Sequence, residues 1–341
     1  MTLPRLVCVA MSPSIDVTYV VDRLAVGRIH RPREIRRLPG GKGINVARVA
    51  HQLGAHVAAT GIVAGHSGAW LVDQLRTAGV PFHAVHGRGE TRACISIADL
   101  SSGEMSQVYE PGTPVDAESW RDLVGHVWRL ARGASWVALC GGLPAGVPQE
   151  GMTYLLQAAR AGGARIAVDT YGDALAVAVE HGCDLIKVNH LEARALLEGL
   201  LPATCRSDFR DPNLTAVHGD WPAAQADPLD LAHRLMGQAE RSQVVIVTAG
   251  EAGAAASVSH GPTLWCSTGV HGDFPVGSGD SFLGGLLARL LTDPDDIETA
   301  LRVAVAAGAA NAVVPGAARV DVRTIDRLAA RALVDAVPVA V

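Results

Sequence analysis

The stretch Pro275–Phe282 combines an anion-binding turn with an adjacent carboxylate. It reads Pro-Val-Gly-Ser-Gly-Asp-Ser-Phe and precedes apolar residues at helical spacing: Leu283, Leu286, Leu287, Leu290 and Leu291. Glycines at a helix N-terminus let backbone N–H groups converge on one point, where the helix dipole favours negative charge. Asp280 could there act as a general base on a hydroxyl group, which contributes roughly 10²–10⁴-fold in rate. A simple helix-capping role for Asp280 fits the motif equally well.

A second glycine-rich stretch opens the helical pattern Ile44–Leu53 and reads Gly40-Gly41-Lys42-Gly43-Ile44-Asn45. Its spacing is not that of a P-loop, GxxxxGK[ST]. Backbone without side chains lets a ligand approach closely, and Lys42 and Asn45 would add a positive charge and a donor–acceptor pair. A capping role alone explains the glycines equally well.

A third stretch, Lys187–Glu192, lies where a predicted strand ends and a helix begins. Asn189 and Glu192 are three residues apart, so they share a helix face and could hold a hydrated metal ion. The same pair also has the spacing of a capping box, with Asn at the N-cap and Glu at N3. From these residues alone, the capping box is the favoured interpretation.

The elements around these stretches alternate between apolar runs and glycine-terminated helical patterns. The predicted strands are Leu6–Met11, His56–Val63, Cys94–Ala98, Trp136–Cys140, Arg165–Asp169, Asp184–Val188 and Gln243–Thr248. The predicted helices include Ile44–Leu53, Leu71–Ala78 and Met152–Ala161, each followed closely by glycine. This alternation predicts an α/β fold with a mostly parallel sheet covered by helices.

Two excursions interrupt that rhythm. Residues 16–38 and 91–110 contain strand-like segments without an intervening helix, and Ser101–Gly103 is a plausible hairpin turn. We expect these segments to pair into a small antiparallel flap over one end of the main sheet. Residues 200–228 are rich in Pro, Asp and Ala, and we expect a surface insertion there. The chain otherwise reads as a single domain over residues 1–341.

Composition narrows the function classes. The 341 residues carry 29 Lys+Arg against 34 Asp+Glu, a net charge of −5, which disfavours a nucleic-acid partner. The apolar fraction of 49% and the charged fraction of 18% exclude a disordered chain. The six cysteines form no CxxC pair, and no 18-residue apolar run predicts a membrane span. Neither GxSxG nor HExxH occurs. We expect a cytoplasmic enzyme.

In this order, the three stretches resemble the ribokinase-like (PfkB-type) carbohydrate kinases over almost the whole chain. The likeness is nearest to the branch that phosphorylates sugar phosphates, namely 1-phosphofructokinase, tagatose-6-phosphate kinase and the minor 6-phosphofructokinase. The matching segments include SPSIDVTYVVDRLAVGRIHRPREIRRLPGGKGINVARV, TRACISI, CGGLPAGV, DLIKVNHLEA, VTAGEAGA, VGSGDSF and AVAAGAANAVVPGA. The resemblance implies an α/β/α sandwich with a β lid, and an ATP- and Mg²⁺-dependent transfer to a hexose phosphate.

The resemblance also implies a role for each motif residue. Asp280 would be the catalytic base, and the anion hole for the transferring phosphoryl group would comprise Gly277, Ser278 and Gly279. The sugar would be bound by Asp16, Gly40, Gly41 and Asn45, and its existing phosphate by Lys42 and Arg92. The ATP phosphates and Mg²⁺, the ion through water, would be served by Lys187, Asn189 and Glu192. The nucleotide would contact Thr248, Gly250, Gly253, Ala307, Gly308 and Asn311.

Arg92 argues for a phosphorylated substrate, because a guanidinium can bind a phosphate in bidentate fashion. Fructose 1-phosphate, fructose 6-phosphate and tagatose 6-phosphate are the expected candidates. Two departures from the family pattern bear on the choice of sugar. Ser12 replaces the usual Asn of Asn-Pro-x-x-Asp, and Gly142 replaces the Ser of Gly-Ser-Leu-Pro, which removes a hydroxyl near the substrate.

Two alternatives stay open. One is a kinase of a free sugar, a sugar acid or a nucleoside, for which Arg92 would be a solvated lid residue. The other is a regulatory protein that binds a sugar phosphate without turnover, against which the intact Gly277–Asp280 sequence argues. By analogy with the family, we also expect a homodimer formed through the lids.

Overall fold

The computed structural model describes residues 5–199, 227–239 and 241–337. Its main sheet has the strand order β14-β13-β12-β11-β10-β9-β8-β1-β4-β5. The bounds are β1 Arg5–Ala10, β4 His56–Val63, β5 Phe82–His86, β8 Trp136–Cys140, β9 Arg165–Asp169, β10 Leu185–Asn189, β11 Val244–Thr248, β12 Ala254–Val258, β13 Thr263–Ser267 and β14 Leu333–Val337. Strands from β11 through to β5 pair in parallel, whereas β12, β13 and β14 extend the sheet in antiparallel fashion.

Helices cover both faces of this sheet. Strand β1 shows why: Leu6 and Cys8 pack into one core, and Val7 and Val9 pack into the other. A strand buried on both faces needs an unbroken apolar run, as the sequence has there. One face carries α1 (Lys42–Gln52), α2 (Gly65–Thr77), α8 (Ser278–Thr292) and α9 (Ile297–Ala312), with α10 (Val322–Ala329) packed against α9. The other carries α3 (Ala117–Ala131), α4 (Gly151–Ala161), α5 (Gly172–His181), α6 (His190–Leu197) and α7 (Pro228–Gln238). The expected α/β fold class is confirmed.

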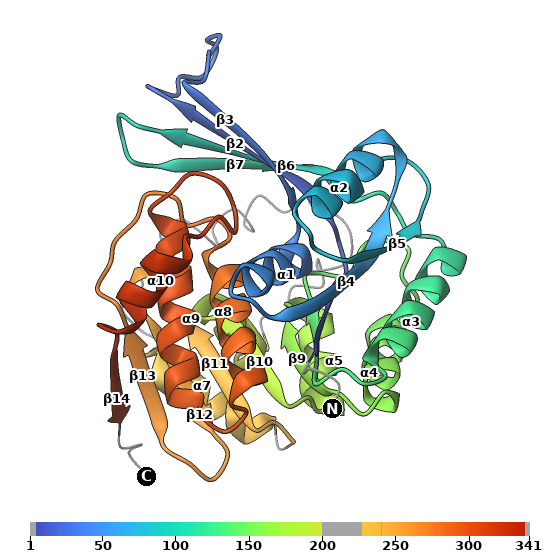
Figure 1. Cartoon of the computed structure of the whole chain (residues 1–341), viewed down its shortest axis with the longest axis vertical. Coiled ribbons are helices and arrows are strands. Elements are labelled where there is room, and N and C mark those ends of the chain that lie inside the picture. The colour runs from blue at the N-terminus through green and yellow to red at the C-terminus, as the bar shows by residue number, and fades with distance from the viewer. Residues whose placement is uncertain (1–4, 200–226, 240, 338–341) are drawn as a thin grey trace.

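A second sheet projects beyond one end of the main sheet (Figure 1). Its order is β3-β2-β6-β7, with bounds β2 Ser14–Val21, β3 Glu34–Gly40, β6 Ala93–Asp99 and β7 Met105–Tyr109. The prediction of a wholly antiparallel flap was wrong, because β2 and β6 are parallel. Strand β2 follows β1, and β6 follows β5. Strands β1 and β5 both belong to the parallel part of the main sheet. The two segments that follow them therefore leave the sheet at the same edge and run in the same direction.

The hairpin between β6 and β7 turns at Ser101–Gly103, as expected, with Gly103 at a φ of 73°. The expected insertion at 200–228 lies, except for its last two residues, outside the described residues. Asp227 caps α7 by accepting a hydrogen bond from the backbone N–H of Leu229, at 3.0 Å. Within the described ranges, no helix is long and apolar enough to span a membrane.

Candidate active site

The carboxyl ends of the parallel strands bring the sequence motifs to one edge of the main sheet. Strand β9 ends at Asp169, β10 at Asn189 and β11 at Thr248. The first turn of α8, with Asp280, faces the same region, because an added Cβ on Gly279 would lie 2.8 Å from Nζ of Lys187 on β10. In open α/β sheets this edge is where ligands bind.

The turn that precedes α8 depends on a left-handed glycine and on a buried amide. Gly277 is the N-cap with a φ of 83°, and an added Cβ would lie 2.5 Å from the backbone N of Ala318. Asn311, fully buried on α9, donates from Nδ2 to the carbonyl of Val276 at 2.9 Å and to Oγ of Ser278 at 3.0 Å. Its Oδ1 accepts from the backbone N–H of Arg319 at 3.2 Å. The structure thus shows the Asn311 side chain holding the turn.

Asp280 and Asp16 are linked through one amide. Nδ2 of Asn45 donates to Oδ2 of Asp280 at 2.9 Å and lies 3.1 Å from Oδ2 of Asp16. Asp16 also accepts a hydrogen bond from the Ser14 hydroxyl at 2.7 Å. An added Cβ on Gly40 would lie 2.1 Å from Cγ of Asp16, so glycine is required there for this carboxylate to occupy its place. Burial raises the pKa of Asp16 despite these hydrogen bonds.

Asp280 has the properties of a proton acceptor near neutral pH. Its side chain is buried, and that burial, together with the negative charge of Asp169, raises its pKa to about 7. Lys42, Lys187 and the hydrogen bond from Asn45 act in the opposite direction. A carboxylate with a pKa near the working pH is well matched to general base catalysis.

Asp169 is the centre of a charge cluster that sequence reasoning missed. This fully buried carboxylate accepts from Nζ of Lys42 at 2.7 Å and from Nζ of Lys187 at 2.9 Å. Burial alone would raise the pKa of Asp169, but Lys187 and Lys42 together lower it. The signal that could have identified Asp169 is its position at the carboxyl end of the predicted strand Arg165–Asp169, where parallel strands bind ligands.

Lys42 also lies 3.6 Å from Oε1 of Glu192. Burial opposes the charged form of Lys42, but Asp169, Glu192 and Asp280 outweigh it and hold the Lys42 pKa well above its usual value. Asn189 and Glu192 form the capping box that begins α6: Oδ1 of Asn189 accepts from the Glu192 N–H, and Oε2 of Glu192 from the Asn189 N–H, both at 2.8 Å. Among the described residues, no three acidic, His or Cys side chains form a metal-binding group.

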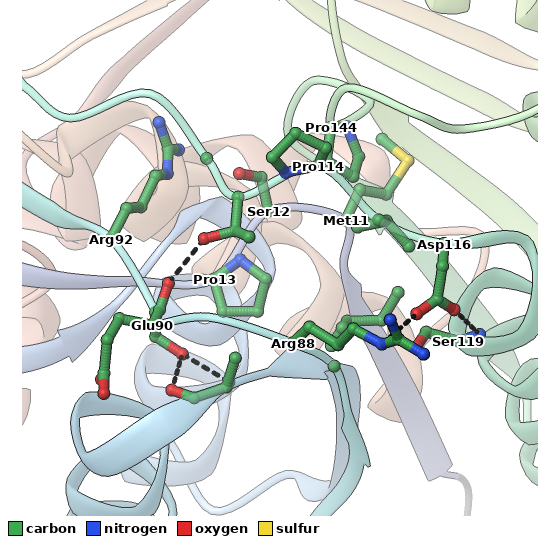
Figure 2. A pocket seen from close by; sticks show the side chains of 17 residues that line it. Met11, Ser12, Pro13, Arg88, Glu90, Arg92, Pro114, Asp116, Ser119 and Pro144 are labelled. Atoms are coloured by element: carbon green, nitrogen blue, oxygen red, sulfur yellow. Dashed lines mark hydrogen bonds and ion pairs between the residues drawn. The ribbon is translucent and has the colours of Figure 1, made fainter.

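Arg92 immediately precedes β6 and lines a pocket together with Ser12, Pro13, Glu90 and Pro144 (Figure 2). Its Nη1 lies 3.4 Å from the carbonyl of Glu110, while its Nε is buried without a hydrogen-bond partner. Of these pocket residues, Ser12 is one of the departures from the family pattern. Arg88, which sequence reasoning did not select, lies on the same pocket but turns toward Asp116, with Nε 3.7 Å from Oδ2.

The residues expected to contact a nucleotide lie beside the α8 turn and at the end of β11. The Thr248 hydroxyl donates to the carbonyl of Val188 at 3.3 Å. Gly253 has a φ of 126°, and an added Cβ would lie 2.3 Å from the carbonyl oxygen of Cys266. The other glycine of this loop, Gly250, is left-handed with a φ of 59°. On α9, Ala307 is buried and an added Cβ on Gly308 would lie 3.2 Å from the carbonyl oxygen of Ser278.

Arg48 is a further buried charge that the sequence did not reveal. Its Nη1 donates to the carbonyls of Pro39 and Ala317, both at 3.2 Å, and to Oδ1 of Asn45 at 3.3 Å. Burial lowers its pKa to about 10, so it remains charged at neutral pH. Arg48 therefore fixes the orientation of the Asn45 amide that bridges the two carboxylates.

Comparison with known proteins decides the family. Residues 4–324 match the model of the pfkB family of carbohydrate kinases. The chain belongs to the pfkB family. As a pfkB protein it is a phosphotransferase, and the family implies ATP as the phosphoryl donor.

Relatives of this pfkB protein cover nearly its full length. It is 29% identical over 335 residues to the 1-phosphofructokinase of Xanthomonas campestris pv. campestris, covering 97% of this chain and 98% of the relative. The Escherichia coli phosphofructokinase-2 structure in complex with fructose-6-phosphate is 26% identical, with a TM-score of 0.77, over 97% of this chain and 99% of that one. The same E. coli protein has also been solved in a tetrameric inhibited form.

The fold of the pfkB chain also matches a possible 1-phosphofructokinase from Thermotoga maritima, with a TM-score of 0.81 at 20% identity, over 98% of this chain and all of that one. At that identity the likeness concerns the fold. The relatives and the family together identify a PfkB-type sugar-phosphate kinase.

Proposed function

We propose that this chain transfers the γ-phosphoryl group of ATP to a fructose phosphate, giving a bisphosphate, with fructose 1-phosphate as the first candidate. The observation that carries the chemistry is the placement of Asp280, with a pKa near 7, in the first turn of α8 and in contact with Asn45. The name of the Xanthomonas relative supports fructose 1-phosphate among the candidates. Fructose 6-phosphate and tagatose 6-phosphate remain in the same substrate class.

We assign a role to each group in this reaction. Asp16 and Asn45 bind hydroxyls of the sugar, and Asp280 accepts the proton of the hydroxyl that attacks the phosphorus atom. The N–H groups of Gly277 and Gly279 would then face the transferring phosphoryl group, with Nζ of Lys187 beside Gly279. The Ser278 N–H, which the resemblance also placed in the anion hole, instead donates to the Pro275 carbonyl at 3.0 Å. Phosphoryl transfer needs positioning and charge neutralisation more than covalent chemistry, which fits this set of groups.

Mg²⁺ fits the charge of this centre. Two ammonium groups, Lys42 and Lys187, face three carboxylates, Asp169, Glu192 and Asp280, so the protein has no surplus positive charge for a triphosphate. Glu192 uses Oε2 in the capping box, and its Oε1 is directed toward the cluster. Glu192 and Asn189 would hold the hydrated ion, which would neutralise the phosphates when bound.

Arg92 supports a phosphorylated acceptor. Its buried Nε has no partner in the protein, and a buried unpaired donor is costly unless a ligand satisfies it. Arg92 pairs through its backbone with Ile15, next to Asp16, so a sugar bound at Asp16 would bring its phosphate within reach of Arg92 and supply that acceptor. Lys42, which the resemblance also placed on this phosphate, is already committed to Asp169, so we assign the sugar phosphate to Arg92.

We also propose a homodimer through the second sheet, which we call the lid. Successive strand residues point to opposite faces, so the face opposite Asp16 carries Tyr19, Ile35, Ile95, Ile97 and Val108, with the exposed Arg37 beside them. Ile35 is 46% exposed and Val108 58% exposed. An exposed apolar sheet face of this kind is suited to a second copy of itself.

The decisive experiment measures ADP release with MgATP against a panel of acceptors. Fructose 1-phosphate, fructose 6-phosphate and tagatose 6-phosphate are compared with fructose, ribose and adenosine, and Asp280→Asn is the inactive control. We expect turnover on a phosphorylated ketohexose. Turnover on a neutral acceptor alone would contradict the substrate class, and sugar-phosphate binding without ADP release would identify a regulatory protein instead.

A further inference from the structure

Two loops beside the candidate site are held in register with each other. Strands β8 and β9 pair in parallel, with Cys140 opposite Asp169. The next residues continue the pairing: the Gly141 N–H donates to the Asp169 carbonyl at 2.9 Å, and the Thr170 hydroxyl donates to the Gly141 carbonyl at 2.7 Å. The following residues of the two loops, Gly142 and Tyr171, therefore lie side by side.

The Tyr171 hydroxyl occupies the space that a side chain at position 142 would need. An added Cβ on Gly142 would lie 2.3 Å from Oη of Tyr171, closer than real Cβ contacts permit. Gly142 stands where the family pattern Gly-Ser-Leu-Pro has serine. The chain thus lacks the serine hydroxyl but brings a tyrosine hydroxyl to the same place from the neighbouring loop.

The tyrosine ring also contacts the charge cluster. Nζ of Lys42 lies 5.7 Å from the centroid of the Tyr171 ring, while the same ammonium group is bonded to Asp169 at 2.7 Å. Tyr171 is the N-cap of α5 and is followed by Gly172 at a φ of 62°, which fixes where the chain turns. Tyr171 is 41% exposed, so its side chain is not enclosed by the protein.

We infer that Tyr171 is a substrate-binding residue whose hydroxyl donates a hydrogen bond to the sugar phosphate, in place of the serine that the family has at position 142. This role rests on the proposed sugar-phosphate kinase function. It makes Gly142 and Tyr171 one specificity element: the glycine leaves room for the phenol, and the phenol replaces the missing donor. A phenol reaches further than a serine and adds an apolar ring, so it favours a different shape of acceptor.

A double-mutant cycle tests this role, with kcat and KM for the sugar phosphate and for ATP measured in each variant. Tyr171→Phe removes the hydroxyl alone, and we expect kcat/KM for the sugar phosphate to fall roughly ten-fold, the effect of one lost hydrogen bond, with KM for ATP unchanged. Tyr154→Phe, on α4 and 44% exposed, is the matched control and should leave both values unchanged.

Gly142→Ser gives the sharper result, because it should lower activity when residue 171 is tyrosine and raise activity when residue 171 is alanine. In the wild-type background the serine displaces the phenol, and activity should fall. In the Tyr171→Ala background the serine has room and returns a hydroxyl, so activity should rise above that of Tyr171→Ala alone. A structural role for Tyr171 predicts no such rescue.

Full activity of Tyr171→Phe, or an equal effect of Gly142→Ser in both backgrounds, would overturn the inference. Failure of the proposed function is distinguishable, because it concerns the wild type. If the wild type uses only a neutral sugar, the substrate class fails, and the same cycle run on that sugar decides the role of Tyr171. If the wild type turns over none of the acceptors, calorimetry measures the dissociation constant of each variant of the cycle for the sugar phosphate. Absence of binding would overturn both proposals.

Discussion

Nδ2 of Asn45 lies 2.9 Å from Oδ2 of Asp280, which joins the first turn of α1 to the first turn of α8. The same amide nitrogen lies 3.1 Å from Asp16, and Arg48 holds the amide oxygen. One side chain therefore sets the separation of a carboxylate on the lid strand β2 from a carboxylate on the main body. The groups expected to bind the sugar and to accept its proton are thus both hydrogen-bonded to the same side-chain amide.

The pH dependence of turnover should report the ionisation of Asp280. Burial and the charge of Asp169 raise its pKa to about 7, and only the deprotonated carboxylate accepts a proton. We expect kcat at saturating substrates to rise with pH and to level off above pH 7, with a value at pH 6 roughly a tenth of the plateau. A kcat that is constant between pH 5.5 and 8.5 would contradict the assignment of Asp280 as the base.

Because its pKa is raised, Asp280 lowers the free energy of unfolding at neutral and alkaline pH. The folded protein keeps a proton that the unfolded chain, with an ordinary carboxyl pKa of 3.8, has released. Stability from this group therefore falls as pH rises from about 4 to about 7, by on the order of 1.4 kcal/mol per unit of pKa difference. Asp280→Asn should be more stable than the wild type at pH 8 and similar to it near pH 4. Denaturant unfolding of both proteins, without ligands, measures the difference; lower stability of the variant at pH 8 would refute it.

Asp169 should contribute more to stability than a typical ion pair. Asp169→Asn leaves the ammonium group of Lys187, whose side chain is 4% exposed, without its carboxylate. Breaking a buried pair in this way costs about 3–5 kcal/mol. The control is Asp73→Asn, which breaks an exposed pair with Arg76 and should cost less than about 1 kcal/mol. Urea unfolding measures the loss of unfolding free energy in each variant. Equal losses would show that the Asp169 ion pairs contribute no more to stability than an exposed pair.

Gly40→Ala should reduce activity by displacing the Asp16 carboxylate. The added Cβ would lie 2.1 Å from Cγ of Asp16, so the carboxylate must leave its contacts with Ser14 and Asn45. We expect kcat/KM for the sugar to fall at least about ten-fold, as for loss of a hydrogen-bonded charged group. Gly237→Ala, in α7 where an added Cβ meets nothing within 4 Å, is the control and should be fully active. Equal activity of the two variants would show that the position of Asp16 is unimportant.

Charges on the apolar lid face should separate the proposed dimer. Val108→Lys combined with Ile35→Lys places two ammonium groups on that face of the lid. We expect light scattering to give twice 35.4 kDa for the wild type and 35.4 kDa for the variant. Trp128→Lys, on α3 and 45% exposed, is the control and should keep the wild-type mass. A wild type of one chain, or a lid variant of unchanged mass, would contradict the proposal.

The sequence predicted the parts of the fold that depend on local patterns. Strands β4, β8 and β9 have the predicted bounds, because each is a continuous apolar run buried on both faces. The glycine-rich starts of α1 and α8 were also recognisable, since glycine there has a geometric purpose. The direction of β6 was not predictable in this way, because it depends on which end of the main sheet the chain leaves.

The residues that the sequence did not reveal act through partners distant in the chain. Asp169 is 127 positions from Lys42, and Arg48 is 269 positions from the carbonyl of Ala317. Arg48 lies on a helix whose apolar spacing gave no reason to bury a charge. The partners of Asn311, in a loop more than thirty positions away, likewise could not be read from its neighbours.

The contact between Gly142 and Tyr171 also constrains how such a chain can have diverged. A serine gained at 142 while the tyrosine is still present collides with it, and a tyrosine lost while the glycine is still present leaves a gap. Each single change therefore passes through an impaired intermediate, and the two positions are expected to be inherited together. In related sequences, glycine at the position of Gly142 should therefore occur together with tyrosine at the position of Tyr171, and this pair could be used to group the sequences of the family.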